Sequence, residues 1–501
     1  MNSSTTSAQL ALPGVPDTVD TARVVEQMVR RAASMGYESW WRRAESVGFC
    51  AHPIQLVGAD EYGRQRAVWT RCNNRRAHIC PSCSDLYARD TWQLVHAGAA
   101  GGHHGMPTAV ADHPQVFVTL TAPSFGAVHA ATSGVDRKPG TCREHHRVGG
   151  YRRCPHGKAL WCSATHDHGD DLVGQPLCEE CYDYVGHVLF TWHLPELWRR
   201  FTITLRRTLR KDLKAAGVDP DGVRVSFIKI VELQARAVPH IHALVRVDPH
   251  DDPDQTDWES PVSAGELGSI IQHAARAMTL TVTDPCADSG VRAIAFGTQI
   301  DTQPITPRSH LVDQASPEKN SSTGRSLSGR RVARYLAKYV TKSLVDLGIS
   351  ARRLSAEAIP DLDVSEHVRT ILSTIAGLAD TGLAGIDRWL HTLGFRGHIT
   401  SKSRRYSTTM TALRERRAAW TRAQHSKNTA QHRDPRSHSG YTSTVDDGSL
   451  VAWEFDRAGY ASLGERTLII SASLRRIQQR HTAREALQPQ RCGPLVEVRD
   501  G

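Results

Sequence analysis

The segment VRVSFIKIVELQARAVPHIHALVRV, residues 223–247, constrains the fold more than any other stretch of the chain. Two runs rich in β-branched residues flank the short stretch QARAVP. This pattern is typical of two strands joined by a tight turn. Because so short a turn folds the chain back on itself, the two strands pair antiparallel. The segment therefore predicts an antiparallel sheet.

The elements expected around this hairpin are a mixture of strands and helices. QVFVTLTAP (115–123) alternates in polarity and is expected to be a strand. Stretches of helical periodicity lie before and after the hairpin, and a last strand and helix close the chain. This order predicts an α+β fold with a central antiparallel sheet and flanking helices. Zinc-binding modules and a mostly helical C-terminal region are expected to accompany it.

At 501 residues the chain is too long for one ordinary core, so several domains are expected. The predicted parts, with their bounds, are an N-terminal tail and helix (1–45), a zinc-ribbon-like module (46–110), a sheet domain (111–345) carrying an inserted zinc module (127–185), a helical and basic DNA-binding region (346–423), and a polar linker with a C-terminal tail (424–501).

Two histidines on the second strand of the hairpin form a candidate metal site. His240 and His242 flank Ile241, so both imidazoles project from one face of the strand. If the hairpin is symmetric about Arg236, Glu232 lies opposite His240 on the same face. A slip of one residue would replace Glu232 by Gln234. Two imidazoles and a carboxylate suit Mg²⁺ or Mn²⁺ acting as a Lewis acid, whereas the alternative is a pair of polar residues on a solvated face.

The stretch RYLAKYVTK (334–342) places two tyrosines on one face of a predicted helix. Tyr335 and Tyr339 are one turn apart, and Lys338 and Lys342 each follow a tyrosine by three residues. A tyrosyl oxygen can attack a phosphodiester and form a covalent phosphotyrosine. A nearby lysine can neutralise the developing charge or assist deprotonation of the phenol. The alternative is an aromatic stripe packed into a core, but the basic neighbours favour contact with phosphate.

Eleven cysteines in the chain point to metal binding. The N-terminus has no pattern of a secretory signal, so a cytoplasmic location is expected, where thiols stay reduced. Cys80 and Cys83 form a CxxC pair that Cys72 and Cys50 precede, which predicts a tetrahedral zinc site with His78 as an alternative to Cys50.

A second CxxC pair, Cys178 and Cys181, predicts another zinc site. Cys154 and Cys162 are its expected partners, and the alternatives to them are Cys142, His156 and His166. The sequence thus predicts one or two structural Zn²⁺ ions.

The net charge favours a polyanionic partner. Lysine and arginine number 62 against 52 acidic residues, a net charge of +10. Lys402, Arg404, Arg405 and Tyr406 combine charge with an aromatic ring, which suits a DNA backbone with a stacked base, although a solvated charged face is the alternative. No apolar run approaches the ~20 residues that a membrane helix needs, so no membrane partner is expected.

Three motifs in this order resemble those of a known superfamily. FVTLTAP (117–123), ELQARAVPHIH (232–242) and YLAKYVTK (335–342) resemble the motifs of HUH-superfamily rolling-circle replication initiators with paired tyrosines. GFCAHPIQL, CPSC, GQPLCEECYDYV and LGFRGHITSKSRRYST more closely resemble the RepSA-like initiators of streptomycete-type plasmids. The similarity covers most of residues 45–420.

This resemblance implies a metal-dependent, site-specific DNA nickase whose HUH endonuclease domain is residues 111–345. It would bind the double-strand origin of a plasmid, nick one strand by tyrosyl transesterification and later rejoin the displaced single strand. His240, His242 and Glu232 would hold the metal, and Tyr335 or Tyr339 would be the nucleophile. Because the chain has no P-loop, a host helicase as well as a polymerase is expected. The alternatives are a two-tyrosine HUH transposase and a non-catalytic zinc-dependent DNA-binding regulator.

Overall fold

The computed structural model is a mixed α+β protein with antiparallel sheets. Its chain divides into two compact units, residues 1–89 with 424–501 and residues 90–423. The structure describes residues 14–15, 19–59, 63–132, 141–143, 153–167, 169–250, 258–307, 327–340, 347, 349, 353–431 and 452–486.

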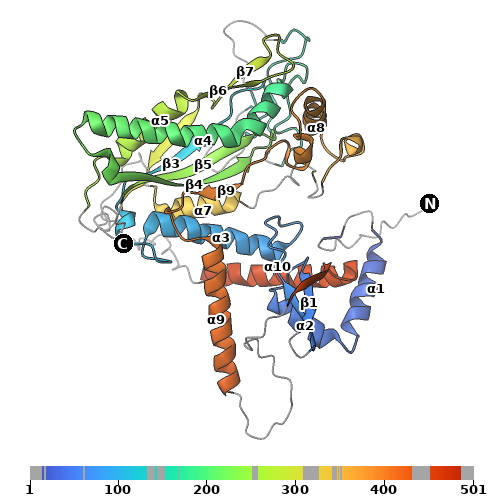
Figure 1. The fold of residues 1–501 in the computed structure, drawn as a ribbon. Helices are drawn as coiled ribbons and strands as arrows, with labels where there is room; N and C mark the ends of the chain where they lie inside the picture. The colour runs from blue at the N-terminus through green and yellow to red at the C-terminus, as the bar shows by residue number, and fades with distance from the viewer. Residues whose placement is uncertain are drawn as a thin grey trace, which may run out of the picture. The chain divides into compact units, whose positions relative to one another are not determined.

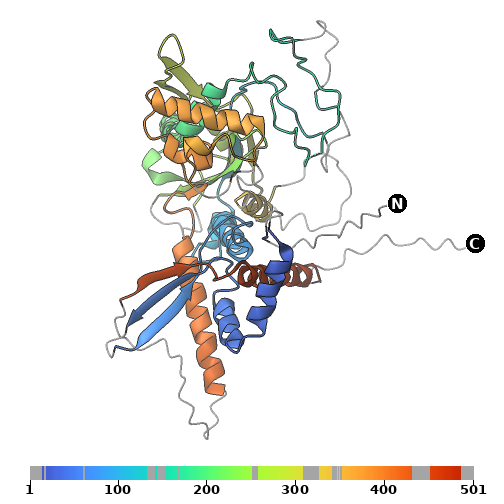
Figure 2. The ribbon, with the colours of Figure 1, turned by 90° about the vertical axis from the view of Figure 1, so that its right-hand side faces the viewer.

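The first unit joins the two ends of the chain. Strands β1 (Ile54–Ala59) and β2 (Gln65–Thr70) form a hairpin, and β10 (Glu454–Ala458) pairs antiparallel with β1. Figure 2 shows this red C-terminal strand beside the two blue ones. Helices α1 (Thr21–Ala32), α2 (Tyr37–Ser46) and α10 (Leu463–Ala486) complete the unit. The last strand and helix were expected from the sequence, but the pairing of that strand, β10, with the N-terminal strand β1 was not.

The second unit is built on a five-stranded sheet in the order β8-β3-β5-β4-β9, in which every neighbouring pair is antiparallel. Its central hairpin pairs Glu232 with His240, which confirms the predicted antiparallel sheet and selects the register symmetric about Arg236 from the two that the sequence left open. At one edge β9 pairs with β4, so a segment beyond residue 345 belongs to this sheet. The strands are β3 (Gln115–Leu120), β4 (Val223–Leu233), β5 (Pro239–Pro249), β8 (Ile300–Pro304) and β9 (Thr400–Lys402).

Two helices cover one face of the sheet. α4 (Tyr184–Ala215) and α5 (Ala264–Arg276) pack on the side chains that alternate strand positions send to that face (Figure 1). Val116 and Val118 of β3 and Val245 of β5 are buried there against apolar residues of α4 such as Leu197 and Phe201. The helical spacing in α4 and the period of two in the strands are both explained by this apolar layer.

The opposite face of the sheet carries the polar positions and is covered by α7 (Gly329–Tyr339). Ile228, Ile230 and Leu244 are fully buried on this face, as are Val332 and Leu336 of α7. The far half of α3 (Pro81–Ala100) also packs in this unit, because the Ala99 methyl lies so close to Gly329 that a Cβ added there would be 2.8 Å away. His240 and His242 point into this layer, since they alternate with core residues such as Ile241.

The remaining elements frame this sheet. α8 (Glu366–Asp380) packs on α4 through a second apolar cluster that includes Ile371, Leu372 and Val188. β6 (Thr279–Thr283) and β7 (Val291–Ala295) form a separate hairpin. No helix in the described residues combines the length and apolar character needed to cross a membrane. The other elements are η1 (Thr108–Ala111), η2 (Pro220–Gly222), η5 (Ala356–Ala358), η6 (Asp387–Thr392) and α9 (Met410–Gln431).

Candidate functional site

The turn of the β4–β5 hairpin sets the register of the candidate site. The Ala237 amide donates to the Gln234 carbonyl at 2.8 Å, and the Gln234 amide donates to the Val238 carbonyl at 3.0 Å. Ala237 has φ 63°, the left-handed conformation that closes a type I turn with a bulge in three-residue hairpin loops. This geometry places Glu232 opposite His240 rather than one residue away.

The two histidines lie side by side on β5 and contact both carboxamide and carboxylate neighbours. Their ring centroids are 4.7 Å apart, and both side chains are buried. His242 Nε2 lies 3.3 Å from Glu232 Oε2, and its Nδ1 lies 3.2 Å from Thr119 Oγ1. Gln234 Nε2 donates to His240 Nδ1 at 3.0 Å. Glu232 and Gln234, which the sequence left as alternatives, therefore both take part, Glu232 beside His242 and Gln234 beside His240.

The electrostatics of this pair favour a neutral imidazole at His240. Burial, followed by the nearby His242, lowers the pKa of His240 to about 4. A neutral ring is the form that binds a metal ion, so His240 needs no deprotonation at neutral pH. Asp301 pairs with Thr119 across the sheet, and its charge acts on His240 in the opposite sense, raising the pKa. Asp301 is not among the site residues predicted from the sequence. The alternation of residues along its strand, β8, was the only sequence signal for which face of the sheet it lies on.

Tyr335 on α7 contacts the histidine pair directly. Its ring meets the His242 ring edge-on, with centroids 5.2 Å apart and an interplanar angle of 89°. Phe117 of β3 completes the group: it stacks on His242 at 5.8 Å and meets Tyr335 edge-on at 5.6 Å. Tyr335 is 38% exposed, so it is not part of a closed core.

The other residues of the predicted tyrosine motif are only partly described. Lys338 is exposed on α7, as are Arg330, Arg331 and Arg334. Tyr339 is the last residue of α7, but its side chain lies outside the described part of the structure. Lys342 also lies outside the described residues. Of the two predicted tyrosines, Tyr335 is therefore the one whose contact with the histidine pair the described residues show.

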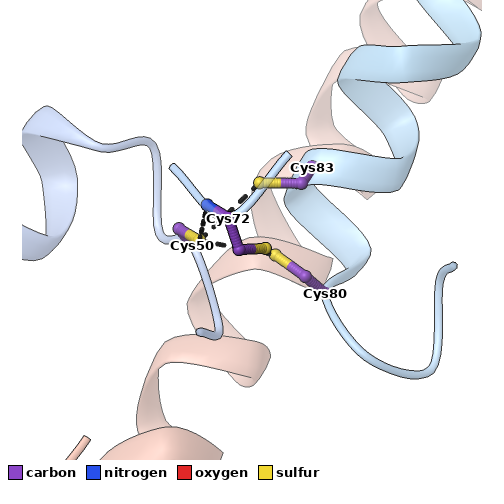
Figure 3. Close-up of side chains that lie close together, drawn as sticks. All are labelled: Cys50, Cys72, Cys80 and Cys83. Carbon is purple, nitrogen blue, oxygen red and sulfur yellow. Dashed lines mark hydrogen bonds between the residues drawn. The ribbon is translucent and has the colours of Figure 1, made fainter. Parts of the chain in front are cut away.

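Cys50, Cys72, Cys80 and Cys83 come together in the first unit, as Figure 3 shows. Cys80 Sγ and Cys83 Sγ lie 3.8 and 3.6 Å from Cys50 Sγ. A zinc–sulfur bond of about 2.3 Å gives a tetrahedron with edges of about 3.8 Å, so the spacing fits zinc. The amides of Ala51 and Cys72 donate to the sulfurs of Cys80 and Cys50, which stabilises thiolates. His78, the alternative ligand, is not in this group.

The cysteines of the insert are grouped differently from the prediction. Cys154, Cys178 and Cys181 converge with His156, whereas Cys162 joins His129, Cys142 and His166 in a separate group. The single site predicted for Cys154, Cys162, Cys178 and Cys181 is therefore wrong. Backbone bridges give the reason: Arg143 pairs with Cys162, and Arg153 pairs with Ala159. These bridges fold the segment into two loops and keep Cys154 and Cys162 apart.

Among the described residues, the three Cys and His groups each bring their ligand atoms within 4.8 Å of one another. Each group supplies four side chains of the types that bind zinc. Glu232, His240 and His242 are not one of these groups. They offer the mixed oxygen and nitrogen donors that suit a different, more open kind of site.

The predicted basic patch is only partly available for DNA contact. Arg404 and Arg405 are exposed, and Arg405 donates to the His250 carbonyl at 3.0 Å. Lys402 is turned inward: its Nζ donates to the Ser407 carbonyl at 2.8 Å, and burial lowers its pKa.

Tyr406 contradicts the prediction that it stacks on a base, because its ring is fully buried. The hydroxyl donates to the Val95 carbonyl at 3.3 Å, and the Arg246 guanidinium lies 5.2 Å from the ring centroid. Gly98 of α3 makes room for the ring, since a Cβ there would lie 2.2 Å from it. Tyr406 thus anchors α3 to the sheet.

Comparison with known proteins adds a family to this geometry. Residues 36–473 match the model of the RepSA family, described as replication initiator protein, pSAM2. A replication initiator protein from Streptomyces ambofaciens is 34% identical over 505 residues, covering 95% of this chain and 98% of that protein. No solved structure matches.

Proposed function

The chain belongs to the RepSA family of plasmid replication initiators, and from this premise we propose that it initiates rolling-circle replication by nicking one strand of the plasmid origin. The proposed chemistry is that of HUH endonucleases. The observation that carries the proposal is the edge-on contact of Tyr335 with His242, at 5.2 Å between centroids, on the sheet face that bears Glu232 and His240. An accessible phenol beside a candidate metal site is what tyrosyl attack on DNA requires.

We assign the metal of this site to Glu232, His240 and His242. The donor set fits Mg²⁺ or Mn²⁺, because a carboxylate oxygen lies 3.3 Å from one of two adjacent imidazoles and burial keeps His240 neutral. Such an ion, when bound, supplies Lewis-acid polarisation of the scissile phosphate.

In the proposed reaction, the phenolic oxygen of Tyr335 attacks the scissile phosphorus. A bond from this oxygen to phosphorus forms as the bond from phosphorus to the 3′-oxygen breaks. The phenol loses its proton and the 3′-oxygen gains one, leaving a 5′-phosphotyrosine and a free 3′-hydroxyl. The exposed Lys338, on the same helix, neutralises charge on the phosphate. Reversal by the new 3′-end rejoins the displaced strand.

Tyr339 and Lys342 have the roles of a second nucleophile and its companion cation in this scheme. One tyrosine would hold the first 5′-end while the other cuts again after a round of synthesis. Exposed arginines of α7 and the pair Arg404 and Arg405 would contact the DNA backbone. A host polymerase would extend the 3′-hydroxyl, and a host helicase would separate the strands.

A nicking assay on supercoiled plasmid carrying the cognate origin tests this proposal. Tyr335→Phe keeps the ring packed on Phe117 and His242 but removes the attacking oxygen, so we expect DNA binding to persist and nicking to fall at least ~10³-fold. Tyr37→Phe, in an aromatic cluster of the first unit, is the matched control and should nick normally. A Tyr335→Phe, Tyr339→Phe double variant that still nicks would refute the proposal.

The metal assignment has its own test in the same assay. His240→Ala removes one ligand, so we expect loss of nicking with an unchanged circular dichroism spectrum. EDTA should abolish nicking by the wild-type protein, and added Mg²⁺ or Mn²⁺ should restore it. Nicking that is undiminished by EDTA would remove the metal from the account. The same assay separates this function from a non-catalytic regulator, and substrates that carry element ends instead of an origin separate it from a transposase.

A further inference from the structure

The insert, residues 127–185, contacts the turn of the β4–β5 hairpin through two routes. We propose that the insert binds two zinc ions and that the two metal centres brace this turn, so that zinc holds the hairpin of His240 and His242 in its register. Zinc binding and bracing are independent of nicking; only their consequence for catalysis rests on the proposed function.

The first centre comprises His129, Cys142, Cys162 and His166. His129 Nδ1 lies 3.2 Å from His166 Nε2 and 3.7 Å from Cys142 Sγ. Cys162 Sγ lies 3.4 Å from His166 Nε2. Zinc–nitrogen and zinc–sulfur bonds of about 2.0 and 2.3 Å give tetrahedral edges of about 3.3 to 3.8 Å, which these distances match.

A carboxylate orients one ligand of this first centre. His166 Nδ1 donates to Asp170 Oδ2 at 2.6 Å, which leaves Nε2 facing the other ligand atoms. A carboxylate that holds the second nitrogen of a ligating histidine is a recurrent feature of zinc sites. The Ala130 amide also donates to Cys142 Sγ at 3.2 Å and stabilises a thiolate there. These contacts lie around the four ligands and point to a built metal centre.

The second centre comprises Cys154, His156, Cys178 and Cys181. His156 Nδ1 lies 3.3 Å from Cys181 Sγ and 3.7 Å from Cys178 Sγ, again within the range of tetrahedral edges. The loop that carries Cys154 is closed by a hydrogen bond from its amide to the Lys158 carbonyl at 2.9 Å. This group therefore joins the middle of the insert to its C-terminal end.

The first route to the hairpin runs through Gly174. The Gly174 amide donates to the carbonyl of the ligand His129, and the His129 amide donates to the Gln175 carbonyl, both at 2.9 Å. Gly174 in turn lies against the turn, where a Cβ would be 2.4 Å from the carbonyl carbon of Ala235. With φ 93°, Gly174 also adopts a conformation that other residues rarely take. The backbone of the first centre therefore lies directly on the turn.

The second route runs through the residues that follow Cys181. Tyr182 donates from its hydroxyl to His187 Nδ1 at 3.2 Å, and His187 Nε2 donates to the Ala237 carbonyl at 3.3 Å. A parallel relay connects Tyr184 to His367 Nδ1 at 3.1 Å, and His367 Nε2 donates to the Arg236 carbonyl at 3.2 Å. Both relays end on consecutive carbonyls of the same turn.

The bracing contacts stabilise an unfavourable backbone conformation at Ala237. The left-handed conformation is unfavourable for alanine, so contacts from outside the hairpin must stabilise it. Without them the turn can relax toward another loop type, and a slip of one residue would turn Glu232 away from the imidazoles. Zinc in the insert thereby controls the geometry of a site to which it contributes no ligand.

The test combines zinc content with hydrogen exchange in the full-length protein. We expect three zinc ions per chain by elemental analysis, one for each described group. His166→Ala and Cys181→Ser should each lose about one zinc ion and speed exchange of the Gln234 and Ala237 amides roughly tenfold or more. Cys72→Ser should lose one zinc ion from the first unit without affecting these amides. Cys286→Ser, an exposed cysteine outside the groups, should change neither.

Gly174→Ala separates bracing from folding of the insert. It adds a methyl group against Ala235 without altering a ligand, so the turn amides should exchange faster while three zinc ions remain bound. One zinc ion per wild-type chain would overturn the metal assignment. Insert variants that lose zinc yet keep wild-type exchange in the turn would overturn the brace, as would equal loosening by Cys72→Ser. None of these outcomes depends on whether the protein nicks DNA.

Discussion

At the scale of single residues, His242 has a contact on every side that the proposed chemistry would use. Thr119 Oγ1 lies 3.2 Å from Nδ1, Glu232 Oε2 lies 3.3 Å from Nε2, and Phe117 and Tyr335 pack on the ring. A hydrogen bond from Nδ1–H to Thr119 would orient the imidazole and leave the Nε2 lone pair on the side of Glu232, as a metal ligand requires. The same residue thus joins the carboxylate of β4 to the phenol of α7.

Two buried histidines behind the hairpin predict how stability depends on pH. Burial lowers the pKa of His187 to about 3 and that of His367 to about 4. Below pH ~6.5 the unfolded chain binds protons that the folded chain does not, so the free energy of unfolding should fall with pH down to the folded pKa values. The expected slope is at most about 1.4 kcal/mol per pH unit for each histidine. Above pH ~6.5 neither contributes a slope.

Urea unfolding between pH 5 and 7 measures this effect. His187→Gln keeps a donor for the Ala237 carbonyl but cannot titrate, so its stability should vary less with pH than that of the wild type. Zinc ligands affect both proteins equally and cancel in the comparison. Equal slopes would mean that His187 is protonated in the folded state.

At the scale of elements, the glycines of two helices predict opposite effects of the same substitution. Gly98 of α3 faces the Tyr406 ring, where a Cβ would lie 2.2 Å away, whereas Gly377 of α8 has nothing within 4 Å. Gly98→Ala should therefore destabilise the protein by about 1 to 3 kcal/mol through overpacking. Gly377→Ala should stabilise it by about 0.5 to 1 kcal/mol through helix propensity. Denaturant midpoints test both, and a neutral Gly98→Ala would contradict the docking of Tyr406.

The sequence predicts the hairpin well because its signals are local. Alternation of β-branched residues and the turn near Arg236 predict the two strands and leave two registers, of which the structure has the one that pairs Glu232 with His240. The edge strand β9 pairs with β4 from about 170 residues away in sequence, and no local pattern identifies such a partner. The prediction that Tyr406 stacks on a base fails for the same reason, since burial of its ring depends on Gly98 in α3. In the insert, cysteine spacing identifies candidate ligands but not which of them lie together, because loop folding decides that.

At the scale of the whole molecule, the chain consists of two units with different kinds of core. The second unit has a large apolar core on a sheet, whereas Val47, Ala51 and Ile470 pack around the four cysteines in the first. A small core of this kind would depend on a bound metal for its stability. The C-terminal segment contributes to it, since Tyr460 donates to the Cys50 carbonyl at 2.9 Å.

Disrupting the four-cysteine group of the first unit should therefore destabilise that unit selectively. In Cys72→Ser we expect limited proteolysis to cleave within residues 1–89 and 424–501 while residues 90–423 resist. In the wild-type protein the described helices and strands of both units should resist, and Cys286→Ser is the control. Uniform cleavage of both units in Cys72→Ser would contradict the division into two independent cores.

The central claim, that a phenol of α7 becomes covalently bound to DNA, is tested most directly by mapping the adduct. The wild-type chain is incubated with its origin DNA and Mg²⁺ or Mn²⁺, denatured and digested, and the peptides are analysed by mass spectrometry. We predict a phosphonucleotide on Tyr335, lost in Tyr335→Phe and kept in Tyr37→Phe. A nicked origin with no tyrosyl adduct on α7 would contradict the account.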